Sequence, residues 1–194
     1  MAGAALLCCM NMSGKHPERA DSDNRATGPV VIESPNKGDG AALWRIARDS
    51  QKLDLNSSYA YLLWCLDFAD TSVVARVDGE VVGFVMGYRR PTTADTALVW
   101  QVAVDSSQRG RGLAGTLLDE LYARLVEEGV RYLDTTITPD NEASIRLFES
   151  FAKRWNAELV RSELFAEDDF PDAHEREDLF RIGPLSPAQR PAGR

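Results

Sequence analysis

A short glycine-rich turn holds the residues of this sequence that are best suited to bind a charged ligand. It consists of Arg109, Gly110, Arg111, Gly112, Leu113 and Ala114. Glycine adopts backbone angles that other residues avoid, and it lets a ligand approach the main chain closely. The helical pattern that follows would begin with unpaired N–H groups and the positive end of a helix dipole. With two arginines beside it, the turn predicts a cradle for a pyrophosphate.

Other interpretations of this turn have to be weighed. Gly110, Gly112 and Gly115 match the spacing G-x-G-x-x-G of a dinucleotide-binding turn, and Asp134 lies where that motif places a ribose-binding acid. A predicted hairpin precedes the turn and Asp134 falls within a predicted strand, which disfavours this interpretation. The Walker pattern is excluded because no Gly-Lys-Ser/Thr follows. The remaining alternative is a plain connection with solvated arginines.

The apolar pattern before the turn predicts a strand, two helices and three more strands. Asp39 is a candidate N-cap for the first helix, and Ser57 or Ser58 for the second. Asp78-Gly79 supplies the positive φ angles of a type I′ hairpin turn. The strands are expected over residues 30–32, 71–77, 81–88 and 98–104.

Leucines at helical spacing predict the longest helix after the turn, up to Gly129. A strand, a helix beginning at Thr138 or Asp140, and two more strands follow. These strands are expected over residues 132–137, 157–165 and 179–182. The order βααβββαβαββ is mixed rather than strictly alternating. It predicts an α/β (α+β) domain whose mixed central sheet has helices on both faces.

Composition favours one domain between two tails. The chain has 194 residues, of which 44% are hydrophobic and 27% charged, enough for a single core. Residues 1–28 are poor in large apolar side chains after Met12, and residues 184–194 repeat proline. We expect both segments to be disordered and the domain to cover residues 29–183.

Charge and cysteine content narrow the class of protein. A net charge of -8 disfavours nucleic acid and anionic membranes as partners and suits a cationic small molecule. Cys8, Cys9 and Cys65 show no metal-binding or disulfide spacing, so no metal is expected. The apolar run 2–10 is too short to span a bilayer and lacks a positive flank. We expect a cytoplasmic protein.

The pattern Arg109-x-x-Gly112-x-Ala114, between a strand and a long helix, resembles the acyl-CoA motif of the GCN5-related N-acetyltransferase superfamily. The resemblance covers about residues 29–183 and implies that superfamily's fold, with acetyl-CoA as co-substrate. It implies that the strand before the turn splays from its parallel neighbour. It also implies that Val102 and Val104 offer backbone groups to the pantetheine, that a nearby N–H polarises the thioester carbonyl, and that Asn141 helps to bind the cofactor.

A more specific resemblance runs through most of the core. The L-2,4-diaminobutyrate acetyltransferases, which form N4-acetyl-diaminobutyrate during ectoine synthesis, are similar over residues 53–61, 83–85, 87–91, 99–105 and 135–141. This family resemblance implies a diamino acid substrate and a homodimer, with an exposed edge strand as a plausible seam.

Diaminobutyrate carries two ammonium groups and one carboxylate, so its pocket needs acids for the amines. Asp54 and Glu177 are the candidate acids, with His174 beside Glu177 in an acid-rich loop over residues 167–178. By spacing alone, a solvated or capping acid is the better explanation of Asp54, and a solvated turn is the better explanation of the loop. The resemblance favours a binding site for both.

Aromatic residues complete the predicted pocket. Trp100 lies in the strand next to the expected thioester, where its indole can stack on the substrate or pack in the core. Tyr59 and Tyr61 are candidate substrate contacts, although helical spacing makes one of them a packing residue. Pairing of Arg89 or Arg90 with the substrate carboxylate and a solvated hairpin end explain these two arginines equally well.

The chemistry expected at this site is direct attack of an amine on the thioester. An alkyl ammonium must first lose a proton, which a carboxylate acting through water or a neutral His174 can accept. Cys65 has no nearby histidine in the sequence and is expected to be buried. Phe148 stands where much of the superfamily has a tyrosine acid. Acetylation of a different amine, or acetyl-CoA sensing without turnover, are the alternative functions.

Overall fold

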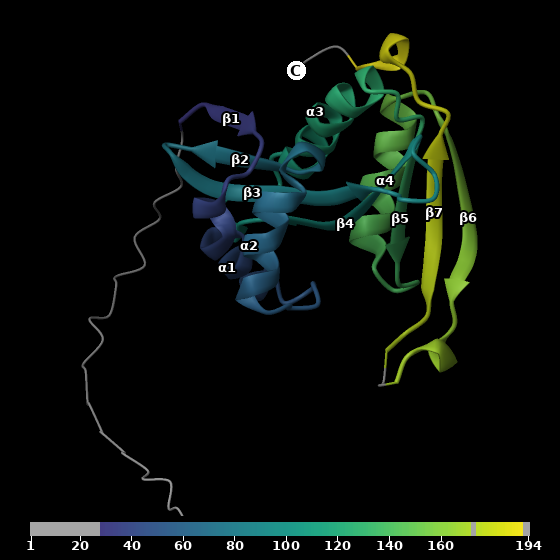
Figure 1. Cartoon of the computed structure of the whole chain (residues 1–194), viewed down its shortest axis with the longest axis horizontal. Helices are drawn as coiled ribbons and strands as arrows, with labels where there is room; N and C mark the ends of the chain where they lie inside the picture. The colour runs from purple at the N-terminus through teal and green to yellow at the C-terminus, as the bar shows by residue number, and fades with distance from the viewer. Residues whose placement is uncertain (1–27, 172–173, 192–194) are drawn as a thin grey trace, which may run out of the picture.

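The protein is built around a seven-stranded mixed sheet, seen in a computed structural model that describes residues 28–171 and 174–191 (Figure 1). The strand order is β1-β2-β3-β4-β5-β7-β6, and among the described residues only β4 and β5 pair in parallel. The strands are β1 (Val30–Glu33), β2 (Val73–Val77), β3 (Glu80–Arg89), β4 (Thr96–Val104), β5 (Tyr132–Ile137), β6 (Glu158–Phe165) and β7 (Glu177–Gly183). The predicted element order and mixed sheet are confirmed.

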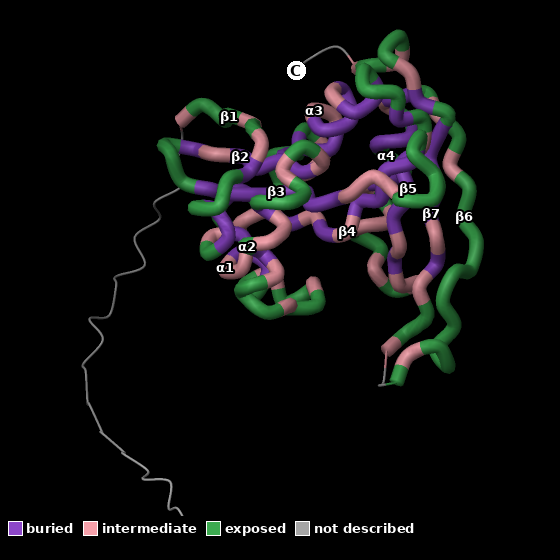
Figure 2. Tube along the Cα trace, in the orientation of Figure 1, coloured by how far each residue is buried: buried purple, intermediate pink, exposed green. Residues whose placement is uncertain are grey.

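Two pairs of helices cover the two faces of the sheet. Helices α1 (Gly40–Ser50) and α2 (Ser58–Asp67) pack on β2, β3 and β4 through a small apolar core that includes Leu43, Tyr61 and Phe84. Helices α3 (Leu113–Glu127) and α4 (Glu142–Arg154) enclose a larger core on the other face. Burial is concentrated in the central strands and the inner sides of these helices, whereas β6 is largely exposed (Figure 2).

Local sequence signals fix several element boundaries. Asp78 and Gly79 have φ angles of 52° and 84°, as the predicted hairpin turn requires. The Ser57 hydroxyl caps α2 by accepting a hydrogen bond from the Ala60 N–H. Asp39 occupies the N-cap position of α1, as predicted, but its side chain makes no capping hydrogen bond. Its carboxylate instead accepts two hydrogen bonds from Arg76 at 2.8 and 2.9 Å, a pairing that offsets the cost of burying the charge.

The chain after β7 packs against the domain, in contrast to the disordered tail expected over residues 184–194. Leu185 is only 1% exposed, and its N–H donates a hydrogen bond to the Arg131 carbonyl. Burial of this side chain supplies the stabilisation that composition alone did not predict. A short 3₁₀ turn (Pro187–Gln189) follows. The predicted N-terminal tail lies almost wholly outside the described residues.

No helix among residues 28–171 and 174–191 combines the length and the apolar character that crossing a membrane requires.

Candidate active site

A cavity of about 340 Å³ opens where β4 and β5 separate. The two strands pair in parallel from Thr96 with Tyr132 to Val99 with Thr135, and β4 then continues to Val104 paired with β3 alone. The residues that line the opening from these strands are Val99, Trp100, Gln101, Val102, Thr135, Thr136 and Ile137. An elongated ligand can therefore enter between two strands of one sheet without breaking a hydrogen bond between them.

A β-bulge at Trp100 shapes one wall of this cavity. Met86 pairs with Gln101 and Gly87 with Val99, so Trp100 is the extra residue in β4. Its indole stacks on Trp64 of α2 with a centroid distance of 4.6 Å. The extra residue of a bulge is unpaired in the ladder, so the backbone here has polar groups available to a ligand.

The neighbouring Gln101 ties the sheet to the loop between α1 and α2. Its amide nitrogen donates to the Asp54 carbonyl at 2.9 Å, and its amide oxygen accepts from the Tyr61 hydroxyl at 3.1 Å. Sequence reasoning did not single out Gln101. A glutamine inside an apolar strand was nevertheless a usable signal, because a buried amide needs partners.

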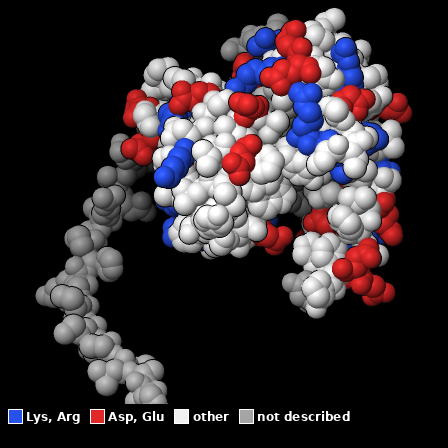
Figure 3. Space-filling view, viewed as in Figure 1, with Lys and Arg blue, Asp and Glu red and all other residues white. Residues whose placement is uncertain are grey.

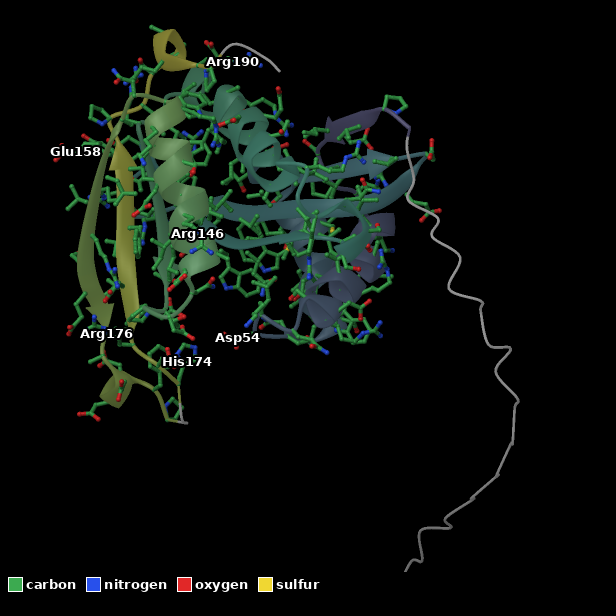
Figure 4. All side chains as sticks on the ribbon, turned by 180° about the vertical axis from the view of Figure 1, so that it is seen from behind. Asp54, Arg146, Glu158, His174, Arg176 and Arg190 are labelled. Atoms are coloured by element: carbon green, nitrogen blue, oxygen red, sulfur yellow. The ribbon has the colours of Figure 1, made fainter. Side chains whose placement is uncertain are left out.

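The three predicted catalytic residues meet at the mouth of the cavity. His174 Nε2 lies 3.5 Å from Asp54 Oδ2 and 4.0 Å from Glu177 Oε1. Asp54 comes from the α1–α2 loop and His174 from the segment before β7, so they approach from opposite sides (Figure 4). Acidic side chains also gather on the turn at Glu167–Asp169, at the tip of the same β6–β7 connection (Figure 3).

The environment of His174 favours its protonated form. Its Nδ1 lies 2.6 Å from the Glu175 carbonyl, an acceptor, so Nδ1 must carry the proton of a neutral ring. The Nε2 lone pair of that neutral ring then faces two carboxylates. The hydrogen bond with Glu175, followed by the interactions with Asp54 and Glu177, raises the pKa of His174. Nε2 is therefore a proton acceptor with two acids placed to stabilise the resulting cation.

The Glu177 carboxylate is partly buried, and its hydrogen bonds do not fully offset the cost of removing its charge from water. Burial raises the pKa of the Glu177 carboxyl, and the hydrogen bond from Thr136 opposes that effect only in part. Within the described part of the chain, its Oε2 is buried and has no hydrogen-bond partner. An unpaired buried carboxylate oxygen favours a cationic ligand that donates to it. By contrast, the Asp54 side chain is 86% exposed.

The predicted phosphate turn has the backbone that its glycines implied. Gly110 and Gly112 have φ angles of 77° and 73°, and a Cβ at either position would meet nothing within 4 Å. Gly112 is the N-cap residue of α3 and has no side chain that could cap the first N–H groups of this helix. Arg109 and Arg111 are exposed beside them. Ala114 lies in the first turn of α3.

Other predicted site residues lie as follows. Val102 lines the cavity and Val104 packs against the larger core. Asn141 lines the cavity and caps α4 by accepting from the Ser144 N–H at 3.1 Å. Tyr59 is 66% exposed and Tyr61 is buried, and neither is among the residues that line the cavity.

The two hairpin arginines are engaged elsewhere. Arg89 pairs with Glu128 at 3.0 Å, and Arg90 Nε lies 2.9 Å from Asp134 Oδ2. Residues that line the cavity but were not singled out in advance include Lys52, Thr136, Thr138 and Ser144.

Cys65, the candidate nucleophile for a covalent route, is not among the residues that line the cavity. Cys65 is 2% exposed, and burial raises the pKa of its thiol to about 11. Phe148 lines the cavity at the place where a tyrosine acid was expected in the superfamily, and it has no hydroxyl. Among residues 28–171 and 174–191, no group of three or more His, Cys, Asp or Glu side chains is arranged to hold a metal ion.

Comparison with known proteins agrees with this geometry. The family model of the acetyltransferase (GNAT) family matches residues 41–152, more than half of the chain. The chain belongs to the GNAT family. As a GNAT enzyme it is an acetyl-CoA-dependent N-acetyltransferase, and the acyl-CoA motif expected from the sequence lies within the matched region.

Several individual members of the GNAT family are similar to this chain over most of its length. The L-2,4-diaminobutyric acid acetyltransferase of Streptomyces coelicolor is 60% identical over 164 residues, which cover 83% of this chain and 96% of the relative. That of Marinococcus halophilus is 49% identical, covering 84% of this chain and 95% of the relative. The diaminobutyrate acetyltransferase EctA of Paenibacillus lautus, solved with L-2,4-diaminobutyric acid and coenzyme A, has a TM-score of 0.77 and 40% identity. The match covers 81% of this chain and 96% of that one.

Proposed function

We propose that this enzyme transfers the acetyl group of acetyl-CoA to the 4-amino group of L-2,4-diaminobutyrate, giving N4-acetyl-diaminobutyrate for ectoine synthesis. One observation carries the proposal. The cavity between β4 and β5 has an acid–histidine group at its mouth, formed by Asp54, His174 and Glu177. Such a group suits a diamino acid, and the relatives that bear this substrate's name support the same choice.

In this proposal the acids select and orient the substrate. Glu177 and Asp54 bind the α-ammonium group, and the indole of Trp100 supports the carbon chain. With the α-amino end held at the mouth, the 4-amino group extends toward the gap between the strands. Only the distal amine then reaches the thioester, since attack requires a separation of about 3 to 3.5 Å. Tyr61 contributes through Gln101 rather than by touching the substrate.

The cofactor is held on the other side of the same gap. Arg109, Gly110, Arg111, Gly112 and Ala114 bind the pyrophosphate at the start of α3, where N–H groups and the helix dipole favour an anion. Val102 and Val104 offer backbone groups to the pantetheine arm, and Asn141 adds a polar contact from the start of α4.

The proposed reaction needs three things from the protein. His174 Nε2 accepts the proton that the ammonium group must lose, directly or through water, and the neighbouring carboxylates stabilise the imidazolium that forms. The amine nitrogen then bonds to the thioester carbon, while backbone N–H groups at the Trp100 bulge stabilise the oxyanion. As the C–S bond breaks, the proton held at the site passes through solvent to the thiolate, because Phe148 cannot donate one.

Product analysis tests this function. The purified enzyme with acetyl-CoA and diaminobutyrate should release free thiol, and NMR should find the acetyl group on N4. Ornithine and lysine should be poorer substrates because added methylenes misplace the nucleophile. Mainly α-acetylated product, or a preference for a polyamine or aminoglycoside, would replace the proposal with another GNAT reaction. Acetyl-CoA binding without thiol release from any amine would indicate a sensing module.

We infer that the enzyme acts as a homodimer in the cytoplasm, where thiols such as Cys65 stay reduced. The edge strand β6 supports dimerisation because it exposes Val160 by 51% and Phe165 by 46%. Val160→Lys should convert the dimer to a monomer in light scattering after size exclusion. Leu66→Lys, on the outer face of α2, is the matched control since Leu66 is 64% exposed. If only Leu66→Lys dissociates the dimer, the seam is at α2 and the β6 assignment is wrong.

A further inference from the structure

An aromatic ring covers one face of the His174 imidazole. The rings of His174 and Phe170 have centroids 4.1 Å apart and an interplanar angle of 19°, so they form a nearly parallel stack. His174 is among the residues that line the cavity between β4 and β5, whereas Phe170 is not. Phe170 therefore reaches the cavity through His174 rather than by lining it.

The β6–β7 connection holds Phe170 in place. Phe170 follows the 3₁₀ turn Glu167–Asp169, which is closed by the Asp169 carboxylate as it accepts a hydrogen bond from the Ala166 N–H at 2.8 Å. Phe165, the last residue of β6, packs edge-on against Phe170 with a centroid distance of 6.1 Å. The ring is thus supported by the turn and by the end of a strand before it meets the imidazole.

The other contacts of His174 fix its ring less firmly. Nδ1 bonds the carbonyl of Glu175, which is the next residue in the chain and moves with it. Nε2 lies 3.5 Å from Asp54 and 4.0 Å from Glu177, and the Asp54 side chain is 86% exposed. Within the described part of the chain, Phe170 provides the one aromatic stack on this ring. It is the contact best placed to fix the direction of Nε2.

We propose that Phe170 is a positioning residue that holds the His174 ring with Nε2 toward the substrate amine and stabilises the imidazolium formed when Nε2 accepts the proton of the ammonium group. The proposal rests on the proposed function of His174 as the proton acceptor. Attraction between a cation and the face of an aromatic ring extends to about 6 Å from the centroid, so the stack lies well within its range.

The stack favours the imidazolium because it leaves the polar edge of His174 free. The two N–H groups of an imidazolium point outward in the ring plane, here toward the Glu175 carbonyl and toward Asp54 and Glu177. Phe170 covers the apolar face instead, so it removes little hydration from the donors. The attraction between cation and ring therefore outweighs the loss of hydration, and the stack raises the basicity of Nε2.

The charged groups around His174 are the same in every Phe170 variant. Asp54 and Glu177 face Nε2 from the α1–α2 loop and from β7. The remaining charged side chains in the cavity lining and on the turn before Phe170 are Lys52, Asp140, Glu175, Glu167, Asp168 and Asp169. A comparison of Phe170 variants therefore isolates the effect of the stack on the pKa of His174.

An NMR titration of the full-length enzyme without substrates tests the stack. The chain has two histidines, His16 and His174, so His174→Gln assigns their signals. In the wild type, the ring current of Phe170 should shift the His174 ring protons upfield. Phe170→Leu keeps an apolar side chain but removes the aromatic ring, and should lower the pKa of His174 by about half a pH unit. Phe170→Tyr keeps the stack and should preserve the wild-type pKa.

Kinetics at about pH 8.5, where His174 is neutral, separate positioning from binding. Phe170→Leu should lower kcat about threefold to tenfold and leave the KM for diaminobutyrate nearly unchanged, since Phe170 does not line the cavity. The limb of the pH profile that belongs to His174 should move to lower pH with its pKa. Phe170→Tyr should keep the wild-type rate. Trp44→Leu, which removes an aromatic ring from a contact with Arg48 on α1, is the control and should change neither pKa nor rate.

An unchanged His174 pKa in a folded Phe170→Leu variant would overturn the proposal, and so would a wild-type spectrum without the upfield shift. Equal losses of kcat in Phe170→Leu and Phe170→Tyr would also contradict it, because only the first removes the stack. The titration contains neither acetyl-CoA nor an amine, so its result does not depend on diaminobutyrate being the acceptor. Failure of the proposed function would instead appear in the product analysis.

Discussion

Replacement of Gly112 by aspartate is expected to weaken acetyl-CoA binding at least about a hundredfold while the protein remains folded. The position has a φ of 73° and open space around a would-be Cβ, so the side chain itself fits. Asp is among the residues that tolerate this backbone region. The new carboxylate, however, would stand at the uncapped start of α3, where the pyrophosphate is proposed to bind. It would satisfy the N–H groups that the ligand needs and repel the phosphates.

Gly129→Asp is a matched control for this substitution. Gly129 also has a positive φ, of 90°, with nothing within 4 Å of a would-be Cβ, but it follows the far end of α3. Both variants therefore carry the same kind of backbone cost and the same added charge. Calorimetry should find normal acetyl-CoA affinity for Gly129→Asp only. Normal affinity in a folded Gly112→Asp variant would remove the phosphate assignment from the turn.

Elements of the fold could be predicted from the sequence where they depend on a repeated apolar spacing or on a few adjacent residues. Apolar spacing of 3.6 residues along α3 and the Asp78-Gly79 turn each depend on a few adjacent residues. The position of Asp39 at the start of α1 was predicted, but its missing capping hydrogen bond was not, because the carboxylate pairs with Arg76 on a strand that lies 37 residues away. The docking of the C-terminal segment was missed since it depends on one buried leucine, Leu185, in a proline-rich stretch.

In the active site, too, the residue types could be read from the sequence, whereas contacts between distant segments could not. The side chains of Asp54, His174 and Glu177 indicated acid–base chemistry. Their proximity in space, however, depends on how the fold places a loop beside a strand more than a hundred residues away in the sequence. The bulge at Trp100 could not be predicted, since it arises from a one-residue difference in register between β3 and β4. Spacing alone could not distinguish Tyr61, whose hydroxyl bonds Gln101, from Tyr59, whose side chain is exposed.

Replacement of Glu177 by glutamine should lower kcat/KM for diaminobutyrate about tenfold to a hundredfold and leave acetyl-CoA affinity nearly unchanged. A charge-assisted hydrogen bond contributes about 1.5 to 3 kcal/mol, and the substitution removes the charge while keeping the shape. Asp54→Asn should act in the same direction. Glu158→Gln, an exposed acid on β6, is the control and should keep wild-type kinetics.

The Glu177→Gln variant should also be more stable than the wild type at neutral pH. Burial raises the pKa of Glu177 above its ordinary value of 4.5, so the folded state binds this proton more tightly than the unfolded state does. Ionisation of Glu177 therefore costs stability as pH rises from about 4.5 through the folded-state pKa. Glutamine removes that cost, and the melting temperature at pH 7 should rise by about 2 °C.

Melting curves of the wild type and of Glu177→Gln, recorded from pH 4 to pH 8, test the direction of this stability difference. The difference between Glu177→Gln and the wild type should vanish near pH 4, where both side chains are neutral, and grow toward pH 7. In the wild type, kcat/KM should rise with pH as Glu177 ionises, and the variant should lose that limb of the profile. A variant that is less stable than the wild type at pH 7, with unchanged kinetics, would make Glu177 a structural acid and would leave the α-ammonium group without its proposed partner.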